Sequence, residues 1–424
     1  KDLETGLNIH TEMARTGMIE KDAYIGSSLV DMYVKCGSLT RAYKVFEELP
    51  VRNVVVWTCL LSGYGDHGCA NISVNVFDYM QIEGVHPNAI TYVCMLKACG
   101  SLRALGKGIY THAEIERLGL LTKCNPFLGG ALVDMYAKCG VLAIAHEVLE
   151  HLPIRNIVSW TALLVGYVEY DHGEIALDCF RKMQEEGISP NVATISCALK
   201  ACRSILAIDE GRRIHADVQM DNSLAGDHVV GSALVDMYAR FGMLAEAQEV
   251  FSNLLDRDIV SWTSLIAGYA EHGYAKNALK CLHQMQVEGV PPNDLTLVCC
   301  LKACASIGVT CSKGTEIHSE IERSGLLGRN VFVGSSLVDM YAKCGFAGKA
   351  QEVLDNLSVR NVVSWTALIA GYLKHGCGVE ALKYFERMQF EHACPNLVTF
   401  ICSLKACSNL GAAGKGQEIH VEMK

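Results

Sequence analysis

The sequence lacks three features that would each have pointed to a broad class of protein. It has no run of about 18 apolar residues, so no membrane-spanning helix is predicted. Its formal net charge is −9, which is mild for 424 residues and argues against a broadly basic nucleic-acid-binding surface, although a local basic stripe stays possible. No two cysteines are spaced C-x-x-C, which weakens a zinc-ribbon or dithiol redox interpretation.

The first residue is Lys1, which falls inside a repeating pattern, so we expect a fragment or a processed chain. No targeting segment opens the sequence, and its absence says nothing about the compartment. The length alone would suggest about three domains, but internal repetition takes precedence over that estimate.

Most of the 20 cysteines follow a repeat. They recur as "KCG" at Cys36, Cys139 and Cys344, and as "KAC" at Cys99, Cys202, Cys304 and Cys407, while Cys94, Cys197, Cys299 and Cys402 form a third series. A free buried cysteine behaves as a small apolar residue. We therefore predict packing thiols in a reducing compartment.

Four tryptophans measure the repeat. Near copies of "NVVSWTALIAGYLKHG", which begins at Asn361, place Trp57, Trp160, Trp262 and Trp365 at spacings of 103, 102 and 103 residues. Such regular repetition indicates stacked structural units. The period subdivides into three: 31 residues (Val331–Asn361), 35 residues (Val362–Asn396) and 36 residues (Val192–Asp227), with copies of the third differing by one residue.

Each unit has the pattern of two helices. In 23–53, apolar residues follow helical spacing on both sides of Gly37. Gly37, Gly140, Gly242 and Gly345 fall where a first helix must end, and Pro87, Pro190, Pro292 and Pro395 fall just before unit boundaries. No strand pattern competes. Because one hairpin cannot bury its apolar face alone, we predict an α-solenoid whose first helices form a concave face.

These residues resemble the pentatricopeptide repeat family, in its PLS subclass of alternating unit lengths. Near copies of "LVDMYAKCG", "SWTALIAGY" and "LKAC…IH" carry the resemblance over the whole chain. It implies an all-α, right-handed α-α superhelix of stacked helix-turn-helix units. The predicted array contains S units 23–53, 126–156, 228–258 and 331–361; P units 54–88, 157–191, 259–293 and 362–396; L units 89–125, 192–227 and 294–330; and partial L units 1–22 and 397–424.

The resemblance implies binding of single-stranded RNA, one base per unit, read by the fifth and last residues while the second packs on the base. Second, fifth and ninth places share one helix face, and unpaired bases expose their Watson–Crick edges. The predicted base-packing residues are Val55, Val158, Val260 and Val363. The predicted base-reading residues are Ser27, Asn53, Thr58, Asn88, Asn156, Thr161, Asn191, Ser196, Asp227, Ser232, Asp258, Thr263, Asn293, Ser335, Asn361, Thr366 and Asn396.

In the family, a hydroxyl residue with asparagine resembles an adenine code, and one with aspartate a guanine code. A hydroxyl can donate to the adenine ring nitrogen. Gly130 leaves unit 126–156 without a hydroxyl beside Asn156, and Val93, Val298 and Ile401 cannot hydrogen-bond in their L units. With the N-terminus at the RNA 5′ end, the implied preference is A-A-n-n-A-(G)-G-A-n-A-A, which is purine-rich and A-biased.

Lysine recurs at the ninth place of the L units, at Lys97, Lys200, Lys302 and Lys405. These lysines are candidates for phosphate contacts, and the alternative is a solvated stem that covers apolar surface. The S-unit lysines Lys35, Lys138 and Lys343, and Arg240, each follow an aspartate by four residues, so we expect helix ion pairs. With acids such as Glu169 and Glu271 nearby, a shallow salt dependence is expected.

We identify no catalytic residue, metal site or cofactor. "H-x-E" at His112, His318 and His420 lacks the P-C-x-x-C of a zinc deaminase and repeats once per long period, which favours a structural role. The resemblance implies the recognition part of a chloroplast or mitochondrial C-to-U RNA editing factor. Its partners would be single-stranded RNA, with no DNA and no membrane, and editing-factor proteins docking on L units or a deaminase in trans. The alternatives are the guiding half of a longer deaminase or nuclease, and a scaffold like the tetratricopeptide repeats.

Overall fold

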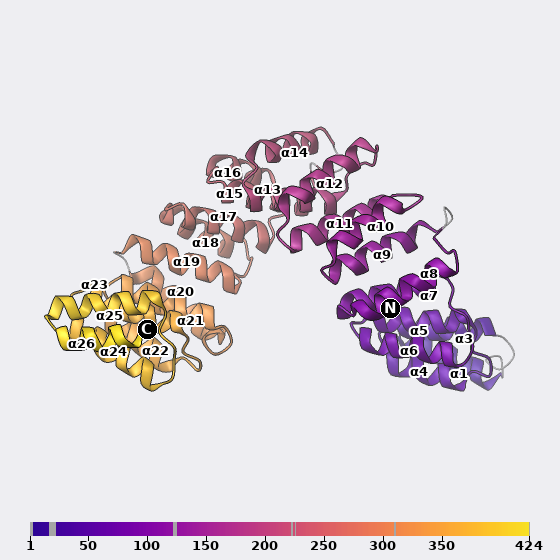
Figure 1. Ribbon diagram of the computed structural model, residues 1–424, viewed down its shortest axis with the longest axis horizontal. Coiled ribbons are helices and arrows are strands. Elements are labelled where there is room, and N and C mark those ends of the chain that lie inside the picture. Colours follow the sequence, from indigo (N-terminus) through magenta and orange to yellow (C-terminus); the bar gives the residue numbers. More distant parts are fainter. Residues whose placement is uncertain are drawn as a thin grey trace. The chain divides into compact units, whose positions relative to one another are not determined.

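A computed structural model describes residues 3–16, 23–121, 125–221, 224, 226–308 and 311–423. Its regular elements are α-helices and one short 3-10 helix, and these residues form no strand (Figure 1). The chain divides into two compact units, residues 1–211 and 212–424, which are described separately. Helix α14 (Ile208–Met220) runs across the division. The prediction of an all-α protein built from helix pairs is confirmed for the described residues.

In the first compact unit each helix pair consists of a first helix with an odd label and a second helix with an even label. Helix α1 at the start belongs to the partial repeat 1–22, of which residues 1–2 and 17–22 lie outside the described residues. The helices are α1 (Leu3–Arg15), α3 (Ala23–Lys35), α4 (Leu39–Glu48), α5 (Val54–Asp66), α6 (Ala70–Ile82), α7 (Ala89–Leu102), α8 (Leu105–Arg117), α9 (Pro126–Lys138), α10 (Leu142–His151), α11 (Ile157–Glu169), α12 (Gly173–Glu185) and α13 (Val192–Ile205).

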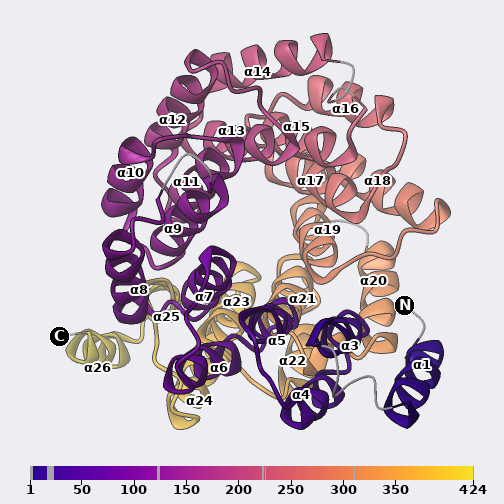
Figure 2. The same cartoon turned by 90° about the vertical axis from the view of Figure 1, so that its right-hand side faces the viewer.

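The second compact unit repeats the same order. Both views show α15, α17, α19 and α21 following one another in space (Figures 1 and 2). The elements are α15 (His228–Arg240), α16 (Leu244–Asn253), α17 (Ile259–Glu271), α18 (Ala275–Val287), α19 (Asp294–Ile307), α20 (Cys311–Arg323), the 3-10 helix η1 (Leu326–Gly328), α21 (Val331–Lys343), α22 (Ala347–Asn356), α23 (Val362–Lys374), α24 (Gly378–Phe390), α25 (Leu397–Leu410) and α26 (Ala413–Glu422).

Within each compact unit, successive first helices pack against one another, and most first helices also pack against their own second helix. The four S-unit pairs turn at Gly37, Gly140, Gly242 and Gly345, whose φ angles lie between +75° and +87°. A residue with a side chain is strained in this left-handed region, which explains the glycine in each copy. Many second helices also pack against the first helix of the following pair, as α6 does on α7 and α18 on α19.

The four tryptophans are core residues of the stack and are at most 2% exposed. Trp57 meets Phe46 edge-on at a ring-centroid distance of 4.5 Å, and Trp262 meets Phe251 in the same way at 4.5 Å. Each contact joins the second helix of an S unit to the first helix of the following P unit. The repeated tryptophan is therefore explained by packing, because it fills the space between consecutive helix pairs.

A glycine in each P-unit first helix permits close approach to the preceding S-unit first helix. A Cβ atom placed on Gly268 would lie 2.6 Å from the Cβ of Ala239, and one on Gly371 would lie 2.5 Å from the Cβ of Ala342. Such distances are too short for carbon atoms, so the contact needs glycine at this place. This tight packing fixes the register in which successive first helices present their N-terminal turns. None of the described helices is long and apolar enough to cross a membrane.

Candidate nucleic-acid interface

The last residue of nearly every predicted unit is the N-cap of the next first helix. Its side-chain oxygen accepts hydrogen bonds of 2.8–3.1 Å from backbone N–H groups of the first turn. The capping atom is Oδ1 in each case, so the cap does not use the second side-chain atom. Asn53, Asn88, Asn156, Asn191, Asp227, Asp258, Asn293, Asn361 and Asn396 all cap in this way.

The fifth-place hydroxyls are directed to the backbone of their own helix. Six of them donate to the carbonyl four residues earlier at 2.5–2.7 Å: Thr58, Thr161, Ser232, Thr263, Ser335 and Thr366. Ser27 donates to the carbonyl of Tyr24 at 2.9 Å. The sequence interpretation, in which the hydroxyl donates to adenine, did not take this competing acceptor into account. In this arrangement the hydroxyl oxygens can act toward a ligand as hydrogen-bond acceptors.

In two S units the fifth and last residues contact each other directly. Ser232 Oγ lies 3.1 Å from Asp258 Oδ1, and Ser335 Oγ lies 3.1 Å from Asn361 Oδ1. Both serines are buried, whereas Asp258 and Asn361 are half-buried at the helix start. The two predicted reading residues, 26 positions apart in sequence, therefore form one polar group at the junction of two units.

In three P units a threonine of the following L unit connects the fifth and last residues. Thr263 Oγ1 lies 2.7 Å from Thr296 Oγ1, and Thr296 Oγ1 lies 2.8 Å from Asn293 Oδ1. The same contacts join Thr58, Thr91 and Asn88 at 2.8 and 3.0 Å, and Thr366, Thr399 and Asn396 at 2.7 and 2.9 Å. Each of these L-unit threonines also closes a capping box with its asparagine.

The remaining P unit, 157–191, is built differently. Thr194 Oγ1 donates to the backbone oxygen of Asn191 at 2.9 Å, and Thr194 N–H donates to Asn191 Oδ1 at 2.9 Å. Thr161 Oγ1 contacts the carbonyl of Ile157. Thr161 is half-buried and Asn191 is exposed, so neither predicted reading residue is sealed inside the stack.

Two further predicted positions have distinct surroundings. Asn156, which faces Gly130 in place of a hydroxyl, directs Nδ2 toward the carbonyl of Pro126 at 3.4 Å. A Cβ on Gly130 would meet Val158 at 3.4 Å, so the site is closely packed without a side chain.

Ser196 is buried and its Oγ has no hydrogen-bond partner within the described residues. Ser196 and Asp227 belong to different compact units, and each is described within its own unit.

The second place of each unit carries an exposed side chain beside the caps. The predicted base-packing valines Val55, Val158, Val260 and Val363 are 46–53% exposed. Sequence reasoning assigned this role only to P units, although the same place carries a large apolar side chain that is 42–78% exposed in the four S units and in three L units. The missed residues are Tyr24, Ile90, Phe127, Val229, Leu295, Phe332 and Val398. The signal was present in the sequence, as an apolar residue two places after each boundary.

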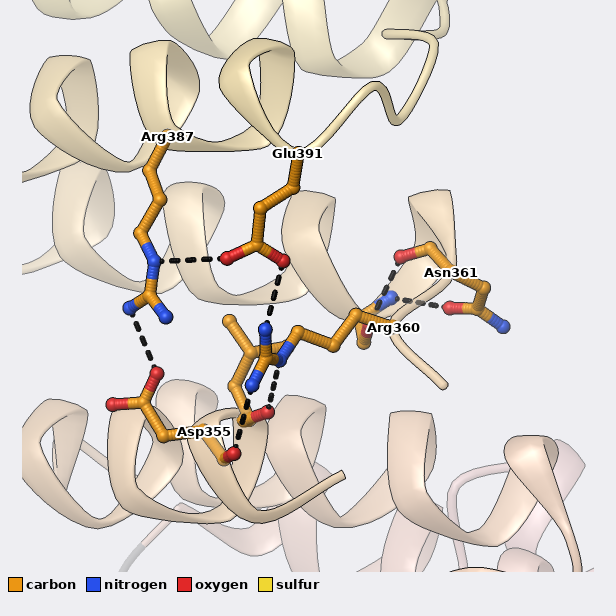
Figure 3. A network of polar contacts seen from close by, with 7 residues as sticks. Asp355, Arg360, Asn361, Arg387 and Glu391 are labelled. Atoms are coloured by element: carbon orange, nitrogen blue, oxygen red, sulfur yellow. Dashed lines mark hydrogen bonds and ion pairs between the residues drawn. The ribbon is translucent and has the colours of Figure 1, made fainter. Parts of the chain in front are cut away.

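An arginine anchors each junction between an S and a P unit. Arg360, next to Asn361, donates from Nη1 to Glu391 at 2.8 Å, and its other nitrogens donate to the carbonyls of Leu354 and Asp355 at 2.9 and 2.8 Å. Figure 3 shows Arg360 between Glu391 and Asp355. Arg387 extends this network, since its Nη1 lies 2.7 Å from Asp355 and its Nε 3.1 Å from Glu391. Equivalent ion pairs form between Arg52 and Glu83, Arg155 and Glu186, and Arg257 and Glu288.

The four ninth-place lysines of the L units are exposed, and no ion pair to them is found among the described residues. The S-unit cations differ. Lys35, Lys138 and Lys343 pair with the aspartates one turn earlier at 2.6–2.8 Å, as expected, and Arg240 contacts Glu271 of the following P unit at 3.1 Å. Lys97, Lys200, Lys302 and Lys405 therefore remain available to a phosphate.

The cysteines and histidines have structural surroundings. Burial raises the pKa of Cys99 and Cys281 to about 11 and that of Cys179 to about 12, so these thiols stay protonated and unreactive at neutral pH. The Nδ1 atom of His112 forms a hydrogen bond with the hydroxyl of Tyr136 at 2.9 Å, and that of His318 does so with the hydroxyl of Tyr341 at 3.0 Å. Burial lowers the pKa of both histidines. No group of three metal-ligating side chains is found in the described residues.

Family models match most repeats of the chain. The model described as "PPR repeat family" matches residues 52–101, 155–204, 257–306 and 360–409, and the model described as "PPR repeat" matches 27–54 and 232–259. Each of the first four matches covers a P unit and the first helix of the L unit that follows. The matches therefore fall on the junctions that contain the tryptophan and the capping asparagine.

Curated proteins of Arabidopsis thaliana are similar over the whole chain. A chloroplastic pentatricopeptide repeat-containing protein is 35% identical over 423 residues, which is 100% of this chain and 52% of that protein. A mitochondrial pentatricopeptide repeat-containing protein is 34% identical over 426 residues, covering 100% of this chain and 60% of that protein. The chain thus spans little more than half the length of these relatives.

A solved structure has a similar fold. The pentatricopeptide repeat protein PPR10, in complex with an 18-nt psaJ RNA element, superimposes with a TM-score of 0.77 at 18% sequence identity. The superposition covers 94% of this chain and 60% of PPR10. At this identity the likeness establishes the helical-repeat fold.

Proposed function

This chain belongs to the pentatricopeptide repeat family, and from that premise we propose that it binds single-stranded RNA in a sequence-specific manner. The observation that carries the proposal is the polar group at each P- and S-unit junction. There a capping Asn or Asp uses Oδ1 for the helix and keeps its second side-chain atom free. The RNA-bound state of PPR10, which shares the fold, supports the same ligand class.

The capping geometry supports a physical reason for the difference between adenine and guanine. With Oδ1 engaged, asparagine offers the N–H donors of Nδ2, whereas aspartate offers the acceptor Oδ2. Adenine N1 is an acceptor and guanine N1–H is a donor on the same base edge, so each side chain matches one purine. The adjacent hydroxyl, whose proton is directed to the helix carbonyl, can accept from the adenine amino group.

The exposed second-place side chains supply the apolar part of the interaction. Bases stack on aromatic and aliphatic surfaces with little dependence on sequence. Phe332 and Phe127 in S units and the valines in P units lie beside the capping residues, where a base facing the cap would contact them. The exposed ninth-place lysines of the L units would contact the phosphates. Because they are few, electrostatic attraction would contribute only modestly to the affinity for RNA.

The proposal assigns adenine to the units that end in Asn53, Asn88, Asn191, Asn293, Asn361 and Asn396, and guanine to units that end in Asp227 and Asp258. The full preference is A-A-n-n-A-(G)-G-A-n-A-A from 5′ to 3′. Binding of this RNA and of a scrambled RNA of equal composition tests the proposal. We expect tighter binding of the matched RNA, and equal affinity for both would contradict sequence reading.

A second variant tests the assignment of a single unit. Replacing Asn191 by Asp turns a donor into an acceptor, so preference opposite unit 157–191 should shift from adenine toward guanine by about 1–3 kcal/mol, as for other base-edge contacts. A competing peptide library serves as the control for a protein scaffold. Displacement of RNA by peptides at the same face would favour that alternative.

We also propose an organellar location and a role in choosing sites for C-to-U editing. The relatives described above are chloroplastic and mitochondrial, and the alternating 31-, 35- and 36-residue units support the editing assignment. In this role the described residues select the site, and a deaminase in trans or elsewhere in the protein performs the chemistry. Loss of C-to-U conversion at one transcript in cells lacking the protein is the expected result, and unchanged editing of all bound transcripts would contradict it.

A further inference from the structure

A third residue type takes part in the polar group at the junction between P and L units. Thr296 is the third residue of its L unit and is fully buried. Its hydroxyl lies 2.7 Å from Thr263 Oγ1 and 2.8 Å from Asn293 Oδ1, the two residues assigned to base reading. Thr91 and Thr399 occupy the same place with the same two contacts.

The protons in this group can be assigned from the chemistry of the atoms. Asn293 Oδ1 carries no proton, so the hydroxyl of Thr296 must donate to it. Thr296 Oγ1 in turn accepts from the backbone N–H of Asn293 at 3.3 Å and from the hydroxyl of Thr263. The proton of Thr263 is therefore held between Thr296 Oγ1 and the carbonyl of Ile259, which lies 2.6 Å away.

We propose that Thr91, Thr296 and Thr399 are positioning residues for base reading by the preceding P units. This inference rests on the proposed RNA-binding function. Each threonine holds the asparagine with its Nδ2 donor outward and holds the fifth-place hydroxyl with its lone pairs outward. Both groups then match adenine, which presents N1 as an acceptor and its amino group as a donor. Guanine presents the opposite polarity at both atoms.

The chain contains an internal contrast at Thr194. This residue has the same place in sequence, but its hydroxyl donates to the backbone oxygen of Asn191. Thr161 is directed to the carbonyl of Ile157. The hydroxyl of Thr194 thus does not connect the two reading side chains, so its removal is a matched control for the removal of the Thr296 hydroxyl.

The test uses the whole chain and synthetic RNAs of the preferred sequence, with A or G opposite unit 259–293, 157–191 or 362–396. Thr296→Val removes the hydroxyl with little change of volume, and Thr296→Ser retains it. We expect Thr296→Val to reduce the A-over-G ratio opposite unit 259–293 by roughly three- to tenfold, the equivalent of one hydrogen bond. Thr296→Ser should retain the ratio, and the ratio opposite unit 362–396 should not change. Thr194→Val should change the ratio opposite its own unit by less than twofold.

A structural role alone predicts a different result. If Thr296→Val weakened binding of the A and G RNAs equally, or left the ratio unchanged, the positioning role would be overturned. If the wild-type chain showed no A-over-G preference at any unit, the proposed function would fail by itself. A crystal structure of the RNA-free Thr296→Val variant then decides the positioning role. We expect more than one Asn293 rotamer, and the single wild-type rotamer would contradict the proposal.

Discussion

The junction after an S unit and the junction after a P unit hold similar proposed base-reading groups by different means. After an S unit, Ser335 contacts Asn361 directly and Arg360 fixes the preceding backbone through Glu391. After a P unit, Thr263 reaches Asn293 through Thr296, and proline precedes the asparagine in place of arginine. In both, Oδ1 caps a helix and the second side-chain atom is available.

The comparison shows that the shared requirement is the cap. An N-cap oxygen must accept from the first turn, and this need gives the asparagine or aspartate the same general orientation at both junctions, while neighbouring side chains hold it in place. The surrounding contacts differ because the second helix that leads to the boundary is shorter in a 31-residue unit than in a 35-residue unit. Variants at the two junctions can therefore separate common from local features.

The largest expected effect is a change of base preference at both junctions. Asn293→Asp and Asn361→Asp each replace an outward donor by an acceptor, so each should move the preference from adenine to guanine by about 1–3 kcal/mol. Affinities for RNAs with A or G at each of the two positions measure this. A shift of base preference at only one junction would show that the two asparagines do not present the same side-chain atom to the base.

The next effect concerns stability and should be confined to the S–P junction. Arg360→Ala removes an ion pair and two carbonyl contacts from a side chain that is 26% exposed, with a partner 28% exposed. Bonds to charged groups of this kind suggest a loss of about 2 kcal/mol in the free energy of unfolding, measured with denaturant.

Arg329 provides the matched control for this variant. It also precedes a unit's last residue, Asn330, but it is exposed and no ion pair to it is found in the described part of the chain. Arg329→Ala should change stability by less than about 0.5 kcal/mol, as is usual for surface substitutions. Equal losses for the two arginine variants would refute the anchoring role of Arg360.

A smaller effect should distinguish the second-place residues of the two unit types. Phe332 of an S unit is 74% exposed and offers an aromatic face, whereas Val363 of a P unit offers a smaller surface. Phe332→Ala should weaken RNA binding by about 1 kcal/mol, at the lower end for base stacking, and Val363→Ala should weaken it less. Titrations with the matched RNA compare the two losses of affinity. A larger loss for Val363→Ala than for Phe332→Ala would contradict base stacking on Phe332.

The smallest effect is electrostatic. Lys302 is exposed with no ion pair found in the described residues, while Lys343 pairs with Asp339 at 2.7 Å. If Lys302 neutralises one phosphate, Lys302→Ala should lower the slope of log affinity against log salt by about 0.7, the value for one single-strand contact. Lys343→Ala should leave the slope nearly unchanged. A larger change of the slope for Lys343→Ala than for Lys302→Ala would assign the phosphate contact to Lys343.

The sequence predicted the helix pairs because these depend on local signals. Gly37 and its counterparts mark the turns, and the tryptophan spacing gives the period. These features need only neighbours along one helix or one turn. The all-α fold was therefore accessible without coordinates.

The hydrogen bonds between units were not accessible in this way. The contact of Thr263 with Thr296 joins residues 33 apart, and that of Arg257 with Glu288 joins residues 31 apart. Both depend on how helices of successive units pack against one another, which a repeat length does not specify. The direction of the fifth-place hydroxyls was missed for a different reason, because the helix carbonyl four residues earlier competes with any ligand for the proton.

Selection of RNA from a random single-stranded pool by the whole chain tests the central claim most directly. The account predicts enrichment of A-A-n-n-A-(G)-G-A-n-A-A, with one nucleotide for each unit and the strongest choice of adenine opposite the units that end in asparagine. Sequencing of the bound RNA gives the answer in a single measurement. Enrichment of an unrelated motif, or a bound pool as varied as the input, would contradict base reading by the capping residues.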